Sequence, residues 1–157
     1  MASEFFFDLD SIDYSQRMAD EAAVARVNPQ GGPMRQLDSV IWHDNPITMG
    51  LGIKQVRHDE FWVPYHVPGR PLMPGVLMIE ACAQLGSYLY RTKVPNLPFV
   101  GFTRCTDTVF RGQVVPGDTF LILCREIECG RRRFISAFQG VVNKKLVMET
   151  TITGMTF

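Results

Sequence analysis

The segment that most constrains this chain joins a stiff loop to one apolar helix. Pro74 suits the first turn of a helix, and residues 76–91 follow it without another proline. Most of these residues favour a helix, and only Gly86 weakens the run. Apolar side chains lie nearly all round the predicted helix, so we expect it to be buried in the core of the fold.

Glu80 is the exception within this apolar helix. The residues three and four positions away from it carry no charge, so no neighbour on the helix can form an ion pair with it. Burying an ionised carboxylate alone is costly. We therefore expect the group to be hydrogen-bonded, shifted towards its neutral form, or facing a cavity, and such carboxyls cluster at active sites. The alternative is a solvated carboxylate that points to the rim of the fold.

Two Pro-Gly pairs, at residues 68–69 and 74–75, fix a turned path between His66 and the helix. Gly75 falls at the helix N-terminus, where unbonded N–H groups and the positive end of the helix dipole can receive an oxyanion. A base, an acid and an oxyanion site would thus all lie near one helix. The alternative for His66 is an ordinary loop histidine bonded to a backbone carbonyl.

The pattern H-x-P-G-x-P-x-M-P-G-V-L-x-x-E-A-x-A-Q over residues 66–84 resembles the signature of the β-hydroxyacyl-acyl carrier protein dehydratases of the FabZ type. A second block, F-R-x-x-V-V-P-G-D over residues 110–118, is similar to the strand and turn that follow the helix in that family. A weaker match is P-x-x-x-P-x-x-x-x-D over residues 29–38. The chain departs from the family where Tyr65 and Val67 flank His66, since relatives usually have Gly and Phe there. Residues 100–109 also form a longer segment than relatives have.

The resemblance implies an α+β architecture, the hotdog fold, in which a curved antiparallel sheet wraps a long central helix. Residues 29–157 would form one domain, and residues 1–28 an N-terminal extension that is partly helical, between Tyr14 and Val27. Phe5 to Phe7 would pack on the domain itself or, as the alternative, dock on a partner surface or tunnel mouth. Alternating apolar and polar residues and turn signals predict strands over residues 39–43, 49–57, 108–115, 119–128, 132–142 and 146–156.

The implied reaction is loss of water from a (3R)-3-hydroxyacyl-acyl carrier protein thioester in fatty-acid biosynthesis, which gives the trans-2-enoyl product. His66 would take the C2 proton, Glu80 would hold or protonate the leaving hydroxyl, and the N–H of Gly75 would polarise the thioester carbonyl. Relatives that also isomerise the double bond usually have Asp at the position of Glu80, so the resemblance implies dehydration alone. No metal and no organic cofactor is expected. The remaining residues that we assign to the oxyanion and substrate-binding site are Val67, Pro74 and Gln84.

The resemblance also implies partners. Relatives place the active site at the interface of a homodimer, with His66 from one subunit and Glu80 from the other, and some assemble three such dimers. The other partner would be the acyl carrier protein, whose surface is acidic. The densest basic run, Arg131, Arg132 and Arg133, is the candidate docking surface, and a solvated turn is the alternative.

Composition narrows the remaining choices. With 16 basic and 16 acidic residues the net charge is zero, which argues against a general nucleic-acid or membrane surface. No leader pattern or long apolar run is present, so we expect a cytoplasmic protein. The four cysteines show no metal-ligand spacing and are expected to be reduced core or strand residues. Two other functions remain open: an acyl-thioester hydrolase on the same fold, and a non-enzymatic acyl-binding protein.

Overall fold

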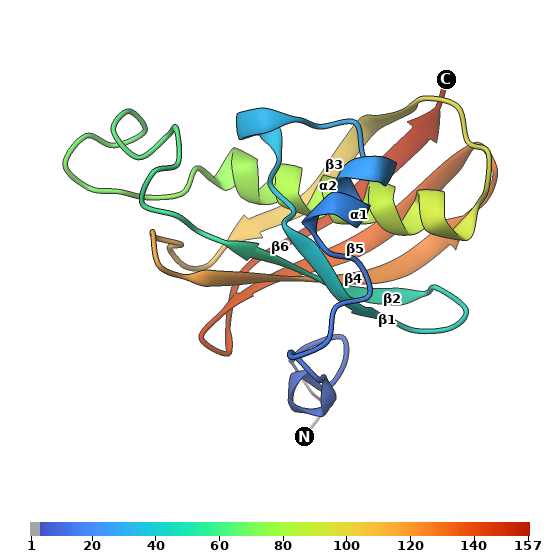
Figure 1. Ribbon diagram of the computed structural model, residues 1–157, viewed down its shortest axis with the longest axis horizontal. Helices are drawn as coiled ribbons and strands as arrows, with labels where there is room; N and C mark the ends of the chain where they lie inside the picture. The colour runs from blue at the N-terminus through green and yellow to red at the C-terminus, as the bar shows by residue number, and fades with distance from the viewer. Residues whose placement is uncertain (1–3) are drawn as a thin grey trace.

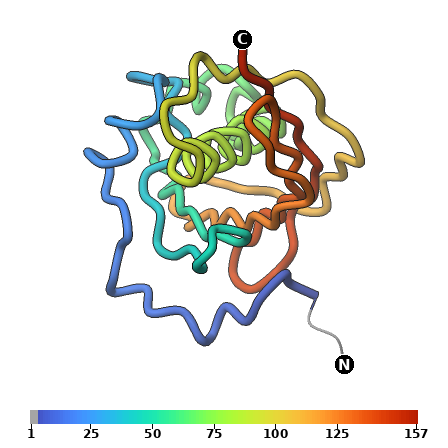
Figure 2. Tube along the Cα trace, turned by 90° about the vertical axis from the view of Figure 1, so that its right-hand side faces the viewer, coloured from blue at the N-terminus to red at the C-terminus, as the bar shows by residue number. Residues whose placement is uncertain are grey.

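The computed structural model describes residues 4–157, which fold around one helix, α2 (Gly75–Lys93). A curved sheet of six antiparallel strands wraps this helix (Figures 1 and 2). The strand order across the sheet is β1-β2-β4-β5-β6-β3. The strands are β1 (Ser39–His43), β2 (Met49–Gln55), β3 (Val100–Phe110), β4 (Thr119–Cys129), β5 (Arg133–Val142) and β6 (Lys145–Thr156). The predicted α+β architecture is confirmed.

The ends of α2 follow from local chemistry. The helix begins directly after Pro74, as predicted, and ends at Lys93, two residues later than expected. Arg91 and Lys93 in its last turn complement the negative end of the helix dipole. The prediction that the helix is buried is confirmed for the face that packs on the sheet, where Ala81, Cys82 and Leu85 are among the buried residues. On the other face Val76 is 70% exposed, and Glu80 is half-buried.

The predicted strand over residues 108–115 is also wrong, while the other strands are confirmed with small shifts at their ends. β3 runs from Val100 to Phe110, and residues 111–118 form the connection to β4. β3 is an edge strand that pairs with β6 alone. Hydrogen bonding to β6, and not a pattern in its own sequence, therefore determines where this strand begins and ends. Two irregularities in this pairing, between Phe102 and Arg104 and between Thr106 and Val109, take up the extra length of the segment.

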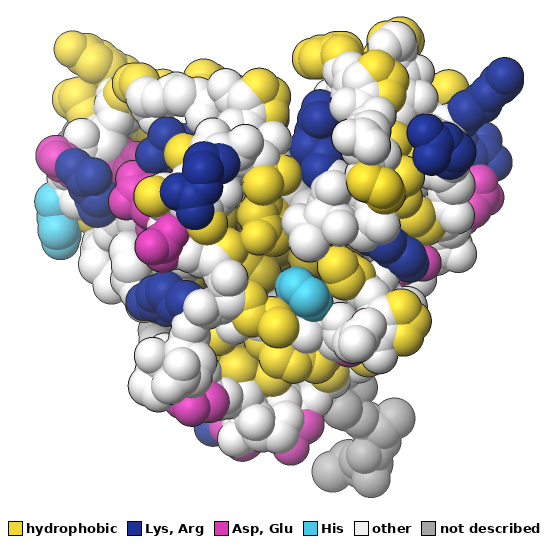
Figure 3. All heavy atoms as spheres, turned by 45° about the vertical axis from the view of Figure 1, so that its right-hand side comes forward, with side chains coloured by type: hydrophobic (Ala, Val, Ile, Leu, Met, Phe, Trp, Pro, Cys, Tyr) yellow, Lys and Arg dark blue, Asp and Glu magenta, His cyan; other side chains and the backbone are white. Residues whose placement is uncertain are grey.

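Large hydrophobic side chains remain exposed along this edge strand. They include Phe102, Val109 and Phe110, and Phe99 and Phe157 are exposed beside its start. Figure 3 shows one face of the molecule on which hydrophobic side chains stay visible between basic and acidic ones. An unpaired strand edge with exposed apolar side chains is typical of a surface that another chain covers.

The sheet buries apolar side chains on both faces. The inner face packs against α2, with Leu85 and Phe138 among the fully buried side chains. The outer face has a second, smaller core that contains Leu51, Leu123 and Val141. The N-terminal residues run round the outside of the sheet in Figure 2, and Phe5, Phe6 and Phe7 pack on this outer core. Of the two expectations for these phenylalanines, packing on the domain itself is confirmed.

A bulge in β6 divides its apolar residues between the two faces. Gly140 lies opposite Met148 and Val141 lies opposite Leu146, so Val147 has no partner of its own. Leu146 consequently packs on the outer core, whereas Met148 belongs to the inner core. The alternation of apolar and polar residues from which the strand over residues 146–156 was predicted is therefore interrupted at this bulge.

The N-terminal extension is less helical than predicted. Only Glu21–Val27 forms an α-helix, α1, and Asp20 caps it by accepting a hydrogen bond of 2.8 Å from the N–H of Ala23. A short 3-10 helix covers Leu9–Ser11, and another covers Gly32–Met34. The remainder up to Asp20 is held by turns and by a bridge between Ala19 and Val40 of β1. Residues 1–3 of the predicted extension lie outside the described residues.

The cysteines are free, as predicted. Cys82 of α2 and Cys124 of β4 are buried, whereas Cys105 is an exposed strand residue. Burial raises the pKa of the Cys124 thiol to about 12, and it also raises the pKa of the Cys82 thiol. Both thiols are therefore protonated near neutral pH and act as packing residues. Among the helices of residues 4–157, none has the length and apolar character needed to cross a membrane.

Gln139 of β5 fastens the N-terminal segment to the outer face. Its Oε1 accepts a hydrogen bond of 3.0 Å from the N–H of Phe6, and its Nε2 donates one of 2.8 Å to the carbonyl of Glu4. We expect Gln139→Leu to lower the free energy of unfolding by about 1–3 kcal/mol, because two backbone groups lose their partners. Urea denaturation measures this loss, and hydrogen exchange at Phe6 should become faster. Unchanged exchange at Phe6 would contradict the proposed fastening.

Candidate active site

The two sequence blocks that carry the resemblance lie against each other in the structure. The loop that contains His66 spans residues 56–74, between β2 and α2. At its start, the N–H of Val56 donates to the carbonyl of Asp118 at 2.9 Å. At its end, the N–H of Met73 donates to the carbonyl of Val114 at 2.8 Å. The second block therefore clamps both ends of the loop that carries the first.

Trp62 supports His66 from within this loop. Trp62 is 2% exposed and belongs to the inner core. Its carbonyl accepts hydrogen bonds from the N–H groups of Tyr65 at 3.1 Å and His66 at 2.8 Å. The backbone of His66 is thereby bonded to the backbone of a residue whose side chain is buried, although the imidazole itself is exposed.

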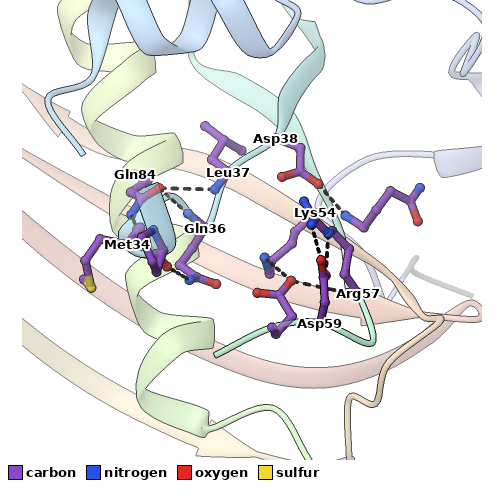
Figure 4. Close-up of polar contacts among 11 residues, drawn as sticks. Met34, Gln36, Leu37, Asp38, Lys54, Arg57, Asp59 and Gln84 are labelled. Carbon is purple, nitrogen blue, oxygen red and sulfur yellow. Dashed lines mark hydrogen bonds and ion pairs between the residues drawn. The ribbon is translucent and has the colours of Figure 1, made fainter. Parts of the chain in front are cut away.

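A buried ion pair ties the same loop to the sheet (Figure 4). The Nζ of Lys54 on β2 lies 2.9 Å from the Oε1 of Glu60, and the side chain of Lys54 is only 3% exposed. Asp38 lies beside this pair and accepts a hydrogen bond of 2.6 Å from the N–H of Gln55. Burial raises the pKa of the Asp38 carboxyl, while the hydrogen bond from Gln55 and the charge of Lys54 oppose that rise. Such a pair is a strong positional restraint, since removing either partner leaves a buried charge.

The imidazole of His66 has a defined tautomer. Its Nδ1 lies 2.7 Å from the carbonyl oxygen of Leu72. A carbonyl oxygen only accepts hydrogen bonds, so Nδ1 must carry the proton of this bond. In the neutral ring Nε2 is then unprotonated and can act as a base. The carbonyl contact expected of an ordinary loop histidine is therefore present. A contact of this kind also fixes the tautomer of histidines that act as bases.

His66 lines an apolar cleft at the N-terminus of α2. Gly75 has no side chain there, and a Cβ on it would lie 2.7 Å from Cζ of Phe110, so only glycine lets this ring lie so close to the start of the helix. The N–H groups of Gly75 and Val76 come before the first hydrogen bond of the helix and can donate to an oxygen atom in the cleft. The residues that line the cleft with His66 are Leu72, Met73, Gly75, Val76, Met78, Phe110, Gly112 and Gln113.

The two other residues predicted for this site lie beside the cleft. Pro74 is buried, and its carbonyl accepts hydrogen bonds from the N–H groups of Leu77 at 2.9 Å and Met78 at 3.3 Å. Val67 is half-buried, and its carbonyl accepts a hydrogen bond from Arg70 at 3.0 Å. Both residues thus shape the loop and the helix start through their backbone.

Glu80 lies in a different cleft of the same chain. Its Oε1 accepts a hydrogen bond of 2.9 Å from Nε2 of Gln84, one helical turn later. Within the described part of the chain this is its one hydrogen bond, so the second carboxylate oxygen can contact a ligand. Glu80 is thus hydrogen-bonded and faces a cavity, two of the three outcomes expected from the sequence. The residues that line this cleft with Glu80 are Gln30, Ala83, Ser87, Val100, Gly101, Phe102, Phe134, Ile152 and Gly154.

Gln84 fixes the position of Glu80 with an amide whose contacts to Met34, Gln36 and Leu37 are drawn in Figure 4. Its side chain is 1% exposed, and its Nε2 also donates to the carbonyl of Met34 at 2.7 Å. Its Oε1 accepts hydrogen bonds from the N–H groups of Gln36 at 2.8 Å and Leu37 at 3.1 Å. The amide therefore uses two donors and two acceptors within the protein. We predicted Gln84 as a substrate-binding residue. In the structure it is buried, and its side chain orients the carboxylate of Glu80.

The structure does not bring His66 and Glu80 into one cleft. The predicted docking run lies elsewhere again, at the turn between β4 and β5, where the carbonyl of Gly130 accepts a hydrogen bond of 2.6 Å from Tyr90. Tyr90 is about 22 Å along α2 from Gly75, at a rise of about 1.5 Å per residue. The run is therefore far from His66 of the same chain. Its Arg133 pairs with Glu128 at 2.7 Å, and the other two arginines are exposed.

Gln30 and Phe134 are lining residues that the sequence did not single out. Gln30 falls inside the weaker sequence match, and its buried Oε1 has no hydrogen-bond partner within residues 4–157. This amide oxygen is therefore an unpaired polar atom at the wall of the Glu80 cleft. No sequence signal marks Phe134, which reaches the cleft only through the pairing of β5 and β6. Across residues 4–157, no group of three or more His, Cys, Asp and Glu side chains could hold a metal ion.

Comparison with known families now identifies the domain. The model of the FabA-like domain matches residues 28–151, which is most of the chain. The chain belongs to the FabA-like domain family. The match includes both His66 and Glu80.

The chain is also similar in fold to several solved structures. The dehydratase heterocomplex ApeI:P from Xenorhabdus doucetiae matches with a TM-score of 0.71 and 16% identity, over 85% of this chain and 90% of that one. A hypothetical thioesterase from Streptococcus pneumoniae, solved with coenzyme A, matches with a TM-score of 0.59 and 11% identity, over 75% and 84%. A mutant of the phenylacetic acid degradation protein PaaI from Thermus thermophilus has a TM-score of 0.57 and 16% identity, over 75% and 91%. At such identities the likeness concerns the fold alone, and the hotdog fold is confirmed.

Replacing Gln84 tests its role in this FabA-like domain. We expect Gln84→Leu to lower the free energy of unfolding by about 3 kcal/mol or more, because two backbone N–H groups and one carbonyl would be buried without partners. Urea denaturation measures this change, and Gln16→Leu on the exposed N-terminal segment is the control. A loss below about 1 kcal/mol, the size of one ordinary hydrogen bond, would contradict the proposed role.

Proposed function

We propose that this chain is a 3-hydroxyacyl-acyl carrier protein dehydratase of the FabZ type. The observation that carries the proposal is the bond between Nδ1 of His66 and the carbonyl of Leu72. It leaves Nε2 as a base in an apolar cleft that also contains the N-terminus of α2. A base next to an oxyanion site is what removal of a proton beside a thioester carbonyl requires.

The steps follow from the roles of these groups. Nε2 of His66 takes the C2 proton while the N–H of Gly75 stabilises the negative charge that develops on the thioester oxygen. The C3–O bond then breaks and the C2=C3 double bond forms. Glu80 gives a proton to the departing hydroxide, directly or through a water molecule, so that the leaving group is water. The side chain of Gln84 holds one oxygen of Glu80 and leaves the other for this transfer.

The two halves of this machinery would meet between two chains. His66 and Glu80 line separate clefts of one chain, as the resemblance implies for a homodimer that shares its active sites. The edge strand β3 has an unpaired side and exposed apolar side chains that a second copy could cover. Three such dimers, as in some relatives, would give a hexamer in a native mass measurement.

The acyl carrier protein would bring the substrate. Arg131 and Arg132 are exposed and carry no ion pair within residues 4–157, so they can attract an acidic surface. Because this run is far from the His66 cleft of its own chain, the proposal requires that it lie near the His66 cleft of the other chain of the dimer. The docking role of these arginines is part of the same proposal. Charge-driven docking weakens as salt is added, so a KM for the carrier-bound substrate that does not change with salt concentration would contradict it.

A hydrolase on the same fold is the second candidate, because the structural neighbours include a protein named as a thioesterase. It predicts release of free thiol and fatty acid, without the enoyl product. The third possibility, an acyl-binding protein, predicts binding without turnover. One assay that follows both the enoyl product and free thiol separates all three.

The test compares the native protein with His66→Ala and Glu80→Gln on 3-hydroxyacyl-carrier protein substrates of several chain lengths. We expect each substitution to lower kcat/KM for enoyl formation by about 100-fold or more, the usual contribution of a general acid or base. His58→Ala is the matched control, since His58 is exposed at a turn of the same loop. Thiol release, or no turnover by the folded native protein, would contradict the dehydratase.

A further inference from the structure

Phe134 of β5 separates two cavities that lie along α2. The Glu80 cleft follows the helix face that carries Ala83 and Ser87 and reaches the Phe134 ring. A second, smaller cavity is also lined by Phe134, and Leu89, Tyr90, Cys124 and Ser136 are among its other lining residues. Phe134 is the residue common to the two linings. The ring is therefore the wall between them.

Two glycines hold the ring in this position. A Cβ on Gly154 of β6 would lie 2.3 Å from Cε1 of Phe134, and a Cβ on Gly86 of α2 would lie 3.0 Å from Cε2. The helix and the neighbouring strand thus contact opposite edges of the ring through bare backbone. The Tyr90 ring packs on it with a centroid separation of 5.1 Å, and Phe134 is only 4% exposed. Because these two positions have no side chain, one large aromatic ring fits between the helix and the strand.

The cleft in front of the ring has the polarity that an acyl chain needs. At one end, Glu80 can contact the hydroxyl at C3 of the substrate. Beyond it the walls are mainly small or apolar, with Ala83 on the helix and Ile152 on the sheet. From Glu80 to Ser87 is about 10 Å of helix, so the space between the carboxylate and the ring suits a chain of limited length.

We propose that Phe134 determines the chain length of the substrate. The acyl chain lies along Ala83 and Ser87 with its methyl end against the ring, and the cavity behind the ring is space that longer chains would enter if the ring were smaller. The inference rests on the proposed function, since it takes the Glu80 cleft as the acyl site. A hydrophobic wall of this kind discriminates strongly, because one surplus methylene costs about 10-fold or more in kcat/KM.

The experiment measures kcat/KM for 3-hydroxyacyl thioesters of four to sixteen carbons with the native protein and Phe134→Leu. We expect the native value to fall steeply at one chain length. In Phe134→Leu this fall should move to longer chains, with a gain of about tenfold at the first length that the native protein rejects. The four-carbon substrate does not reach the ring, so the value of kcat/KM at each longer chain is compared with the value of the same variant on four carbons.

Phe138→Leu is the matched control. Phe138 lies on the same strand, is buried, and contacts the same Gly86 position, but it lines neither cavity. Its substitution should cost similar stability and leave the chain-length profile as in the native protein. If Phe134→Leu does not fold, Ser87→Leu narrows the same cleft from the helix side and should move the fall to shorter chains.

The two failures are distinguishable. If the native protein dehydrates the four-carbon substrate and the profile of Phe134→Leu coincides with the native one, the inference about Phe134 is wrong while the dehydratase stands. If the native protein dehydrates no substrate of any length, the proposed function is wrong, and the assignment of Phe134 is overturned with it.

Discussion

The buried side-chain amide of Gln84 connects the helix to the rest of the candidate site. It is the point at which α2, the segment around Met34 to Leu37, and the carboxylate of Glu80 are held together. A buried amide is stabilising only when all its hydrogen bonds are made, so this contact sets one relative position of the three parts. The placement of Glu80 at the edge of its cleft depends on that position.

The central helix, most of the strands, and the His66 loop that leads into the helix could be predicted from the sequence because they depend on local chemistry. Proline and glycine positions set the start of α2, and turn residues mark the strand ends. The sequence failed where long-range pairing decides. β3 is a strand because β6 pairs with it, and Leu146 changes faces because Val147 is extra in the ladder. Helical composition from Tyr14 was likewise insufficient, and only the residues after the Asp20 cap became helix.

The candidate site residues also divide into those that local sequence reveals and those that depend on contacts between distant segments. His66 and Glu80 could be found from their neighbours in the chain, because an unpaired helical carboxylate and a histidine in a stiff loop are unusual. The tautomer of His66 could not, since it depends on the carbonyl of Leu72 across the turn. Gln30 and Phe134 were missed because their positions arise from packing between distant segments. Their discovery required the folded chain.

The central claim is that His66 of one chain acts with Glu80 of another. The most direct measurement co-expresses His66→Ala and Glu80→Gln chains with different tags and assays the purified mixed dimer. If the sites are shared, one of the two sites in each mixed dimer has both native residues, and activity near half of the native value is expected. A mixed dimer as inactive as the two parent variants would contradict the claim.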